Sequence, residues 1–183
     1  KSYSIRASII AACGGISTIH HPSDCDDAIV AMSAAKALGC RVEKIGKNFY
    51  RIVRVKSIPN VSRVNVGESG TVLRFLLPLL SLYAKKFVVE GRGTLRGRPN
   101  HHLIKTLRTM GVTLKGQGPK GSIPIMISGG TLQGGRYSID GTLSSQFISA
   151  LLIACPQLSQ DTALMITGEE MVSGDYIKMT ESV

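Results

Sequence analysis

In Gly141-Thr-Leu-Ser-Ser-Gln-Phe-Ile-Ser-Ala-Leu-Leu-Ile-Ala154, two hydroxyl groups and an amide directly precede an apolar run that is typical of a helix. The first N–H groups of a helix have no partner within the helix, and the helix dipole favours negative charge at that end. The stretch therefore predicts a helix over residues 145–154 whose start binds an anion.

The same arrangement occurs twice more in the chain. Lys1-Ser-Tyr-Ser-Ile-Arg6 begins one apolar run, and Gly67-Glu-Ser-Gly-Thr-Val-Leu-Arg74 begins another. Small residues at a helix start leave its N–H groups accessible, and the basic residues add positive charge. The three starts predict one pocket for a doubly anionic ligand.

Length and composition predict a globular protein. A chain of 183 residues with 43% hydrophobic residues buries about two thirds of its unfolded surface, enough for one or two compact units without disulfides or metal. No apolar run reaches the roughly 18 to 20 residues of a membrane span, and no secretion signal is seen. We expect a cytoplasmic protein with no membrane partner.

The net charge of +10 favours anionic partners, which include nucleic acids, acidic membranes and phosphorylated metabolites. Aromatic residues make up only 5% of the chain and no long basic block occurs, which disfavours a nucleic-acid partner. The four cysteines form no CxxC pair, so buried reduced thiols are expected. Adjacent side chains diverge, so neither His20-His21 nor His101-His102 forms a chelating pair, and we expect no metal and no cofactor.

The order of predicted elements repeats along the chain, which indicates an α/β protein. The predicted helices cover residues 4–13, 26–38 (capped by Ser23-Asp24), 71–83, 100–110 and 145–154, with another near Tyr176. The predicted strands cover residues 16–19, 41–45, 49–55, 87–90, 112–115, 123–127, 136–139 and 163–167. Two of the helices end at Gly39 and Gly111, 72 residues apart.

Repeated βαβαββ subdomains explain this order, at about residues 1–56 and 62–128, with an incomplete third at about 131–183. The alternative is an ordinary α/β domain, in which strands and helices also alternate. Neither interpretation gives a function by itself.

Five motifs carry a resemblance to a known family. They are Lys1-Ser2-x-Ser4-x-Arg6-Ala7, Gly67-x-Ser69-Gly70-Thr71-x-x-Arg74, Leu95-x-x-Arg98-Pro99, Ser144-Ser145-Gln146-Phe147 and Val172-Ser173-x-x-Tyr176. In this order and spacing, over essentially all 183 residues, they resemble the first domain of the EPSP synthases (3-phosphoshikimate 1-carboxyvinyltransferases).

The resemblance implies an enzyme of the shikimate pathway. Such an enzyme transfers the enolpyruvyl group of phosphoenolpyruvate to the 5-hydroxyl of shikimate 3-phosphate and releases phosphate. The implied fold has two domains, each an inside-out α/β barrel of three βαβαββ units with helices inside and sheets outside. The chain covers one incomplete domain, without the second, so we expect it to bind substrates without catalysing the reaction.

The resemblance also implies a set of site residues. Shikimate 3-phosphate is assigned to Lys1, Ser2, Arg6, Ser144, Ser145, Gln146, Ser173 and Tyr176, and phosphoenolpyruvate to Lys1, Gly70, Arg98 and Gln146. Lys1 is the catalytic candidate, either for proton transfer or for stabilising developing charge, with a pKa lowered by neighbouring cations.

Three nearby residues have simpler interpretations. Arg74 is expected to be a structural ion-pair partner and stays outside the site, and Arg98-Pro99 also fits the residue ahead of a helix with proline first. Glu68 stands where asparagine is more usual in the family and adds an acid beside the phosphate site.

Two alternative functions remain open. One is the sister enolpyruvyl transferase acting on UDP-N-acetylglucosamine, whose usual lysine-asparagine opening and reactive-cysteine loop are not seen here. The other is a non-catalytic module that binds anions or nucleic acid, which the charge favours. We expect a monomer with small-molecule substrates, completed by the second domain of the same enzyme.

Overall fold

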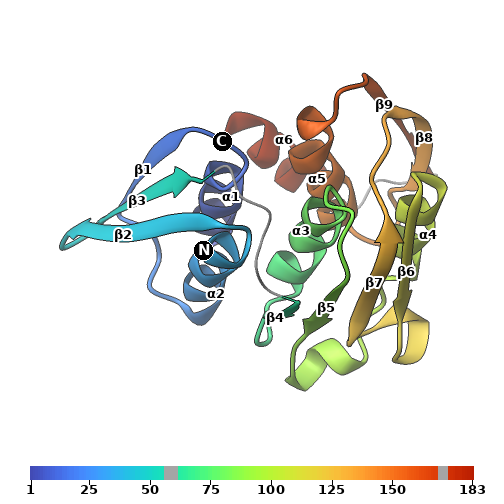
Figure 1. The fold of residues 1–183 in the computed structure, drawn as a ribbon, viewed down its shortest axis with the longest axis horizontal. Helices are drawn as coiled ribbons and strands as arrows, with labels where there is room; N and C mark the ends of the chain where they lie inside the picture. Colours follow the sequence, from blue (N-terminus) through green and yellow to red (C-terminus); the bar gives the residue numbers. More distant parts are fainter. Residues whose placement is uncertain (56–61, 169–172) are drawn as a thin grey trace.

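Strand pairing forms three separate sheets within the computed structural model, which describes residues 1–55, 62–168 and 173–183 (Figure 1). The strand orders are β1-β3-β2, β4-β5-β7-β6 and β8-β9. Helices α1, α2, α3 and α5 lie between the β1-β3-β2 sheet on one side and strands β6, β7 and β8 on the other (Figure 1).

The first sheet and its helices come from the N-terminal part of the chain. The elements are α1 (Ser2–Ala11), β1 (Ile16–His20), α2 (Asp26–Ala37), β2 (Cys40–Gly46) and β3 (Phe49–Arg54). Strands β1 and β2 both pair antiparallel with β3. The expected cap of α2 was wrong, because Cys25 is the N-cap and the Ser23 hydroxyl accepts a hydrogen bond from the Cys25 N–H before the helix begins.

The second sheet has one strand that the sequence pattern did not predict. Its unit consists of β4 (Arg63–Asn65), α3 (Gly70–Leu80), β5 (Phe87–Glu90), η1 (Gly93–Arg96), α4 (His101–Thr109), β6 (Val112–Gly116), η2 (Pro119–Gly121) and β7 (Ile125–Gly130). Strand β4 is only three residues long with a single buried side chain, Val64, so it lacks a detectable alternation. It pairs parallel with β5.

The repeat is visible in the strand pairing. Strands β5-β7-β6 have the same order and the same antiparallel directions as β1-β3-β2. The glycines that follow α2 and α4 both adopt left-handed backbone, with φ of +90° at Gly39 and +95° at Gly111. A positive φ is inexpensive only for glycine, which explains why the matching helix ends use it.

The C-terminal part begins a third unit in the same way. Its elements are β8 (Gly135–Asp140), α5 (Ser145–Ala154), η3 (Cys155–Gln157), β9 (Thr162–Thr167) and α6 (Gly174–Ser182). Strand β8 pairs parallel with β9, as β4 does with β5. The exact limits of the three units stay a prediction, and the expected limit at residue 56 lies outside the described residues.

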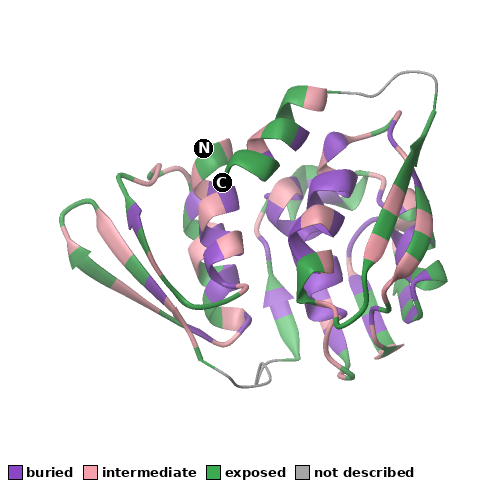
Figure 2. Ribbon diagram, turned by 90° about the horizontal axis from the view of Figure 1, so that it is seen from above, coloured by how far each residue is buried: buried purple, intermediate pink, exposed green. Residues whose placement is uncertain are grey.

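Helices α3 and α5 form the centre of the core and pack against each other. Nearly every residue of α3 is buried, as expected for a helix that is apolar on all sides. The central helices carry many of the buried residues, whereas in the outer strands buried or half-buried residues alternate with exposed ones (Figure 2). Helices therefore lie inside and sheets outside, as expected.

The four cysteines are free thiols, and Cys40 is the fully buried one. Burial raises the pKa of Cys13 and of Cys155 to about 11, so both stay protonated near neutral pH. None of the helices in the described ranges combines the length and the apolar character needed to cross a bilayer.

Candidate anion-binding active site

Five helix starts meet at a cleft of about 720 Å³. The side chains and backbone that line it come from the starts of α1, α2, α3, α5 and α6 and from the segment before α4. The lining includes every residue expected to bind a substrate: Lys1, Ser2, Arg6, Gly70, Arg98, Ser144, Ser145, Gln146, Ser173 and Tyr176. The structure thus brings these ten residues together, while the ligand assigned to each stays a prediction. Val172 of the last motif lies outside the described residues.

Serine hydroxyls cap two of the helix starts at the cleft. Ser69 Oγ accepts a hydrogen bond from the Val72 N–H at 3.4 Å, and Ser144 Oγ accepts one from the Gln146 N–H at 3.3 Å. Ser145 follows as the first residue of α5 and is buried. The capping role and the proposed ligand role of Ser144 are compatible, because its hydroxyl hydrogen is not used by the cap.

Lys1 forms an ion pair at the edge of the cleft. Its Nζ lies 2.7 Å from Oδ2 of Asp27, on the first turn of α2. The hydrogen bond to Asp27 raises the pKa of the Lys1 ammonium above its ordinary 10.5. The expectation of a lowered pKa was therefore wrong, because the nearest charge is a carboxylate and outweighs both partial burial and the charge of Arg98.

Asp27 is a cleft residue that the sequence interpretation missed. Burial alone raises the pKa of its carboxyl, but hydrogen bonds from Lys1 and Ser69 and the charges of Lys1 and Arg98 lower it below the ordinary 3.8. Acidic residues in a first helical turn are common, so the sequence offered no signal beyond the helix start itself.

Arg6 is almost fully buried, at 1% exposure. Its Nε donates to Thr180 Oγ1 at 2.8 Å, Nη1 to the Ser2 carbonyl at 3.3 Å and Nη2 to the Tyr176 carbonyl at 3.1 Å. The guanidinium also lies over the rings of Phe75 and Tyr176, 5.4 and 5.6 Å from their centroids. Burial lowers its pKa. Since a guanidinium has five N–H donors and three have acceptors among the described residues, two are left for a ligand in the cleft as far as those residues go.

The absence of a side chain at Gly70 leaves room for Arg98. A Cβ at position 70 would lie 2.8 Å from Arg98 Nη1. Arg98 is exposed on the cleft and is not the residue ahead of a proline-started helix, because α4 begins at His101 with Asn100 as its N-cap. The chain at Pro99 is held instead by hydrogen bonds to its neighbours, including Asn100 Nδ2 to the Arg98 carbonyl at 3.0 Å.

Glu68 lies in the cleft wall and faces Arg92, with 3.8 Å between its Oε1 and the arginine Nε. Both side chains are largely exposed, so this pair contributes little to stability. The two carboxylates of the lining, Asp27 and Glu68, are each paired with a basic side chain. The positive charge of Arg6 and Arg98 is therefore left to favour an anion.

Contrary to expectation, Arg74 forms no ion pair with a carboxylate of the described residues. It is buried, and its hydrogen-bond acceptors are the side chains of Asn100, Ser144 and Gln146 and the carbonyl of Pro99. Two of these partners, Ser144 and Gln146, are predicted site residues that line the cleft. Arg74 contacts them without being part of the lining itself. The only sign in the sequence that Arg74 has a special role was its position inside an apolar helix.

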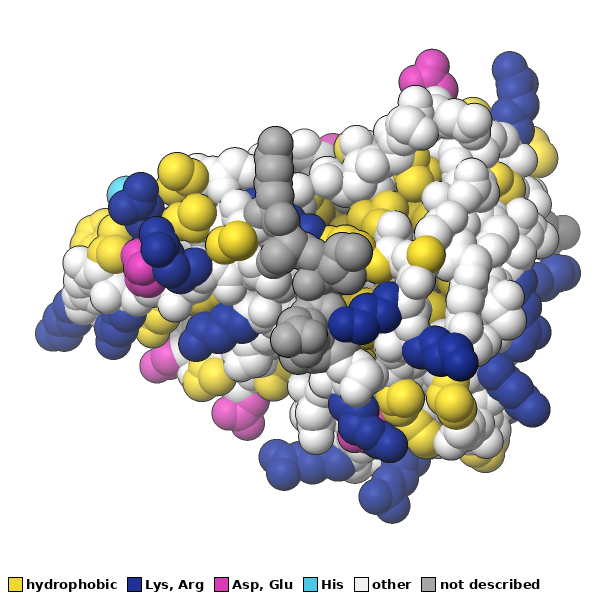
Figure 3. Space-filling model, viewed as in Figure 1, with side chains coloured by type: hydrophobic (Ala, Val, Ile, Leu, Met, Phe, Trp, Pro, Cys, Tyr) yellow, Lys and Arg dark blue, Asp and Glu magenta, His cyan; other side chains and the backbone are white. Residues whose placement is uncertain are grey.

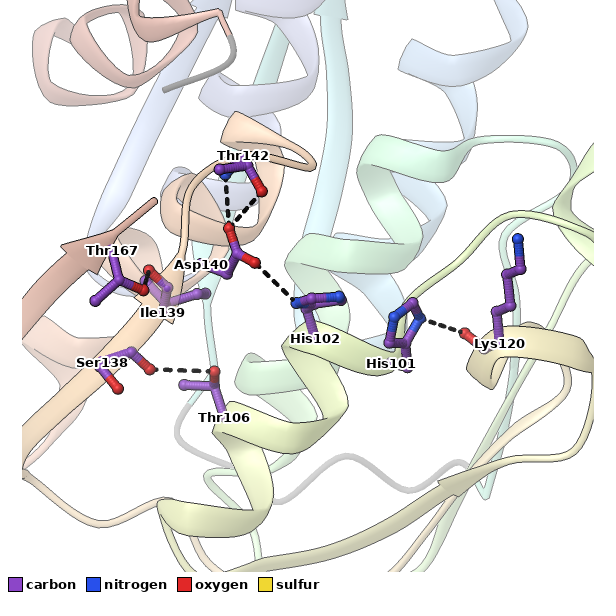
Figure 4. Close-up of polar contacts among 9 residues, drawn as sticks. All are labelled: His101, His102, Thr106, Lys120, Ser138, Ile139, Asp140, Thr142 and Thr167. Carbon is purple, nitrogen blue, oxygen red and sulfur yellow. Dashed lines mark hydrogen bonds and ion pairs between the residues drawn. The ribbon is translucent and has the colours of Figure 1, made fainter. Parts of the chain in front are cut away.

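The turn before α5 is held by Asp140 (Figure 4). Its Oδ1 accepts hydrogen bonds from the Thr142 N–H at 2.8 Å and from the Thr142 hydroxyl at 2.6 Å, and Oδ2 lies 3.5 Å from His102 Nδ1. The Thr142 hydroxyl and backbone hydrogen bonds lower the pKa of Asp140. His101 turns instead toward the Lys120 carbonyl, at 3.2 Å, so the two histidines have different partners.

Surface charge and the placement of possible metal ligands bear on whether the protein has a nucleic-acid or a metal site. On the face drawn in Figure 3, lysine and arginine side chains are scattered over the surface and around its rim, without a continuous basic stripe. Among the described residues, no group of three or more His, Cys, Asp and Glu side chains is placed to hold a metal ion.

Comparison with known proteins gives one family. The EPSP synthase (3-phosphoshikimate 1-carboxyvinyltransferase) family matches residues 1–183. The chain is 38% identical over 182 residues to a 3-phosphoshikimate 1-carboxyvinyltransferase of Methanococcoides burtonii, covering 98% of the chain and 42% of the relative. It is 34% identical over 192 residues to that of Aliivibrio salmonicida, covering 98% of the chain and 43% of the relative.

Solved structures agree with this assignment. The chain resembles the EPSP synthase of Acinetobacter baumannii with a TM-score of 0.81 and 27% identity, covering 99% of the chain and 41% of that protein. The enolpyruvyl transferase NikO of Streptomyces tendae shares the fold, with a TM-score of 0.64 and 14% identity over 96% of the chain and 42% of that protein. The chain thus spans about two fifths of the length of these relatives. It belongs to the EPSP synthase (3-phosphoshikimate 1-carboxyvinyltransferase) family.

Proposed function

We propose that these 183 residues supply one substrate-binding wall of a 3-phosphoshikimate 1-carboxyvinyltransferase. In the proposed reaction, the 5-hydroxyl oxygen of shikimate 3-phosphate forms a bond to C2 of phosphoenolpyruvate. The bond from C2 to the phosphate oxygen breaks, and the hydroxyl proton is balanced by protonation of the released phosphate. The reaction needs no redox partner.

One observation carries this proposal. The ten residues assigned to substrates come from segments as far apart as Lys1 and Tyr176, and all of them line one cleft. Helix starts, hydroxyl groups and cations in one concave site suit a ligand with several negative charges. Family membership supports shikimate 3-phosphate and phosphoenolpyruvate as these anions.

Shikimate 3-phosphate is proposed to bind along α1, α5 and the start of α6. The hydroxyls of Ser2, Ser144, Ser145 and Ser173 would donate to its phosphate and hydroxyl oxygens, with Lys1, Arg6, Gln146 and Tyr176 around them. Ser173 has left-handed backbone, with φ of +56°, which for a serine costs about 1 to 2 kcal/mol. Strain of this kind is often retained where a side chain serves a ligand.

Phosphoenolpyruvate is proposed to bind between the start of α3 and the cations beside it. The backbone at Gly70 approaches the ligand without a side chain, while Arg98 and Gln146 donate hydrogen bonds. Lys1 then acts as a positively charged donor that stabilises developing charge. Because Asp27 raises its pKa, the protonated form dominates near neutral pH, which favours an acid over a base role.

Calorimetric titration with shikimate 3-phosphate tests the proposal. We expect binding that shikimate without its phosphate does not reproduce, because the serine hydroxyls and the cations of the cleft would form charge-assisted hydrogen bonds with the phosphate. UDP-N-acetylglucosamine and a short oligonucleotide are the matched competitors for the two alternatives. Tighter binding of either competitor than of shikimate 3-phosphate would overturn the assignment.

The chain by itself is expected to bind without turnover. The family's reaction joins groups from two domains that close over the substrates, and one wall supplies binding but little stabilisation of the transition state. Phosphate release from phosphoenolpyruvate, assayed with the chain alone and with a complementary second domain, measures this. Robust turnover by the chain alone would show that the catalytic groups lie within these residues.

The remaining features belong to the same proposal. We place the protein in the cytoplasm as a monomer, completed by the second domain of the same enzyme, with two βαβαββ units and an incomplete third in the wall described here. Sedimentation of the purified chain tests the monomer.

A further inference from the structure

Arg74 is a buried cation that has no acidic partner in the part of the chain that the structure describes. Its side chain lies on α3, the residue is 9% exposed, and within the described ranges no carboxylate oxygen lies within ion-pair distance of its guanidinium. Burial and the charge of Arg98 lower its pKa to about 10, so the group stays positively charged near neutral pH. Burying a charge costs several kcal/mol unless hydrogen bonds compensate, so the acceptors around Arg74 matter.

Two of those acceptors hold the chain before α4. Arg74 Nε donates to Asn100 Oδ1 at 3.3 Å, and Nη2 donates to the Pro99 carbonyl at 3.4 Å. The guanidinium also lies over the ring of Phe147, 5.0 Å from its centroid. These contacts fix the plane of the guanidinium, so its remaining nitrogen has a defined direction.

That nitrogen, Nη1, donates to Gln146 Oε1 at 2.6 Å. A guanidinium only donates hydrogen bonds, so the atom of Gln146 that faces it must be the oxygen. The amide nitrogen of Gln146 then points the other way, and neither of its hydrogens has an acceptor among the described residues. Gln146 lines the cleft, so both hydrogens are free for an anion there.

The hydroxyl of Ser144 is also oriented by Arg74. Its Oγ accepts hydrogen bonds from Arg74 Nη1 at 3.4 Å and from the Gln146 N–H at 3.3 Å. A hydroxyl oxygen has two lone pairs and one hydrogen. With both lone pairs used, Ser144 offers only its O–H, which makes it a donor toward the cleft.

We propose that Arg74 is a positioning residue that turns the hydrogen-bond donors of Gln146 and Ser144 toward the anion in the cleft. The identity of that anion rests on the proposed function, whereas the orientation of the two side chains does not. Without Arg74, the Gln146 amide can rotate and present its oxygen to the anion, which replaces an attraction with a repulsion.

The orientation is tested without any ligand, by nuclear magnetic resonance of the Gln146 side-chain amide. A hydrogen bond at Oε1 slows rotation about the amide C–N bond, so we expect slow rotation in the wild-type chain and faster rotation in Arg74→Met. The other four glutamines, Gln117, Gln133, Gln157 and Gln160, are internal controls. Arg108→Met is the matched control, because Arg108 hydrogen-bonds the Leu114 carbonyl and not a cleft residue.

The conservative variant Arg74→Lys keeps the charge but not the planar guanidinium. We therefore expect the Gln146 amide to rotate at a rate between those of the wild-type chain and Arg74→Met. Arg74→Lys also replaces the methionine variant if that chain does not fold by circular dichroism. If a folded Arg74 variant shows the same rate of rotation about the Gln146 amide C–N bond as the wild-type chain, the proposal is overturned.

A double-mutant cycle then tests the effect on binding of shikimate 3-phosphate. We expect Arg74→Met and Gln146→Ala each to weaken binding about tenfold, and the double variant to bind hardly more weakly than either single one. If the affinity losses of the two single variants multiply in the double variant, Arg74 acts independently of Gln146, and the proposal is overturned. If the wild-type chain binds no shikimate 3-phosphate, the proposed function fails, while the amide measurement still decides the role of Arg74.

Discussion

The ammonium nitrogen of Lys1 lies 2.7 Å from Oδ2 of Asp27, so the lysine of the first motif faces the cleft as one member of an ion pair. An anion in the cleft therefore shares Lys1 with a carboxylate. Lys1 is more than half exposed, so solvent screens this attraction and the pair can separate at small cost.

Replacing Asp27 with asparagine should lower the pKa of Lys1, because the hydrogen bond to Asp27 is the main cause that raises it. The same change should strengthen binding of shikimate 3-phosphate about two- to fivefold at low salt, as expected for an exposed charge pair. Titration of the Lys1 side-chain carbon signal and calorimetry measure the two effects. Asp26→Asn is the control, since Asp26 lies on the same helical turn and forms no ion pair with another described residue. An unchanged Lys1 titration would contradict the prediction.

Arg6→Ala should weaken binding of shikimate 3-phosphate and also destabilise the chain by about 2 to 4 kcal/mol. The change removes a buried charge and the hydrogen bonds that its guanidinium donates to Thr180 and to the carbonyls of Ser2 and Tyr176. Urea unfolding measures the stability and calorimetry the affinity. Thr180→Val removes one acceptor while keeping the guanidinium, so it should lower stability less and affinity hardly at all. Equal losses of affinity in both variants would show that Arg6 acts only through the packing of α6.

Gly70→Ala should change stability little but reduce affinity for phosphoenolpyruvate. The new methyl group would meet Arg98 Nη1, which is the end of a flexible side chain and can move away. Displacing that guanidinium removes a charge-assisted donor, worth about tenfold or more in affinity. Direct titration with phosphoenolpyruvate measures this, with Gly97→Ala as a control because nothing lies near a Cβ there. The prediction fails if phosphoenolpyruvate binds Gly70→Ala as well as wild type.

Asp140→Asn should destabilise the chain at neutral pH but not in acid. The pKa of Asp140 is lower in the folded chain than its ordinary 3.8, so its stabilising effect is fully present above that value and is lost as the pH falls through the folded pKa. Urea unfolding at pH 7 and pH 3 should therefore show a difference between variant and wild type that shrinks at the lower pH. Asp161→Asn, in the loop before β9, serves as the control. A difference that is equal at both pH values would rule out this role of the carboxylate.

Local sequence determined the helices and most strands. The helix predicted at residues 145–154 has the observed limits, because its apolar run and its serine cap both act within a few residues. Strand β4 was missed since its three residues become a strand only by pairing with β5, more than twenty residues later. Pairing of this kind depends on the partner strand, which a local pattern does not contain.

For the cleft, the sequence by itself determined which side chains are suited to an anion, because helix starts, glycines and hydroxyls carry that chemistry locally. Only the tertiary structure decided how those side chains are charged and oriented. Asp27 reaches Lys1, and Arg74 reaches Gln146, across packed helices that place residues far apart in the chain within hydrogen-bond distance. The physical reason is that a pKa and a hydrogen-bond direction depend on the nearest groups in space, and packing selects those groups.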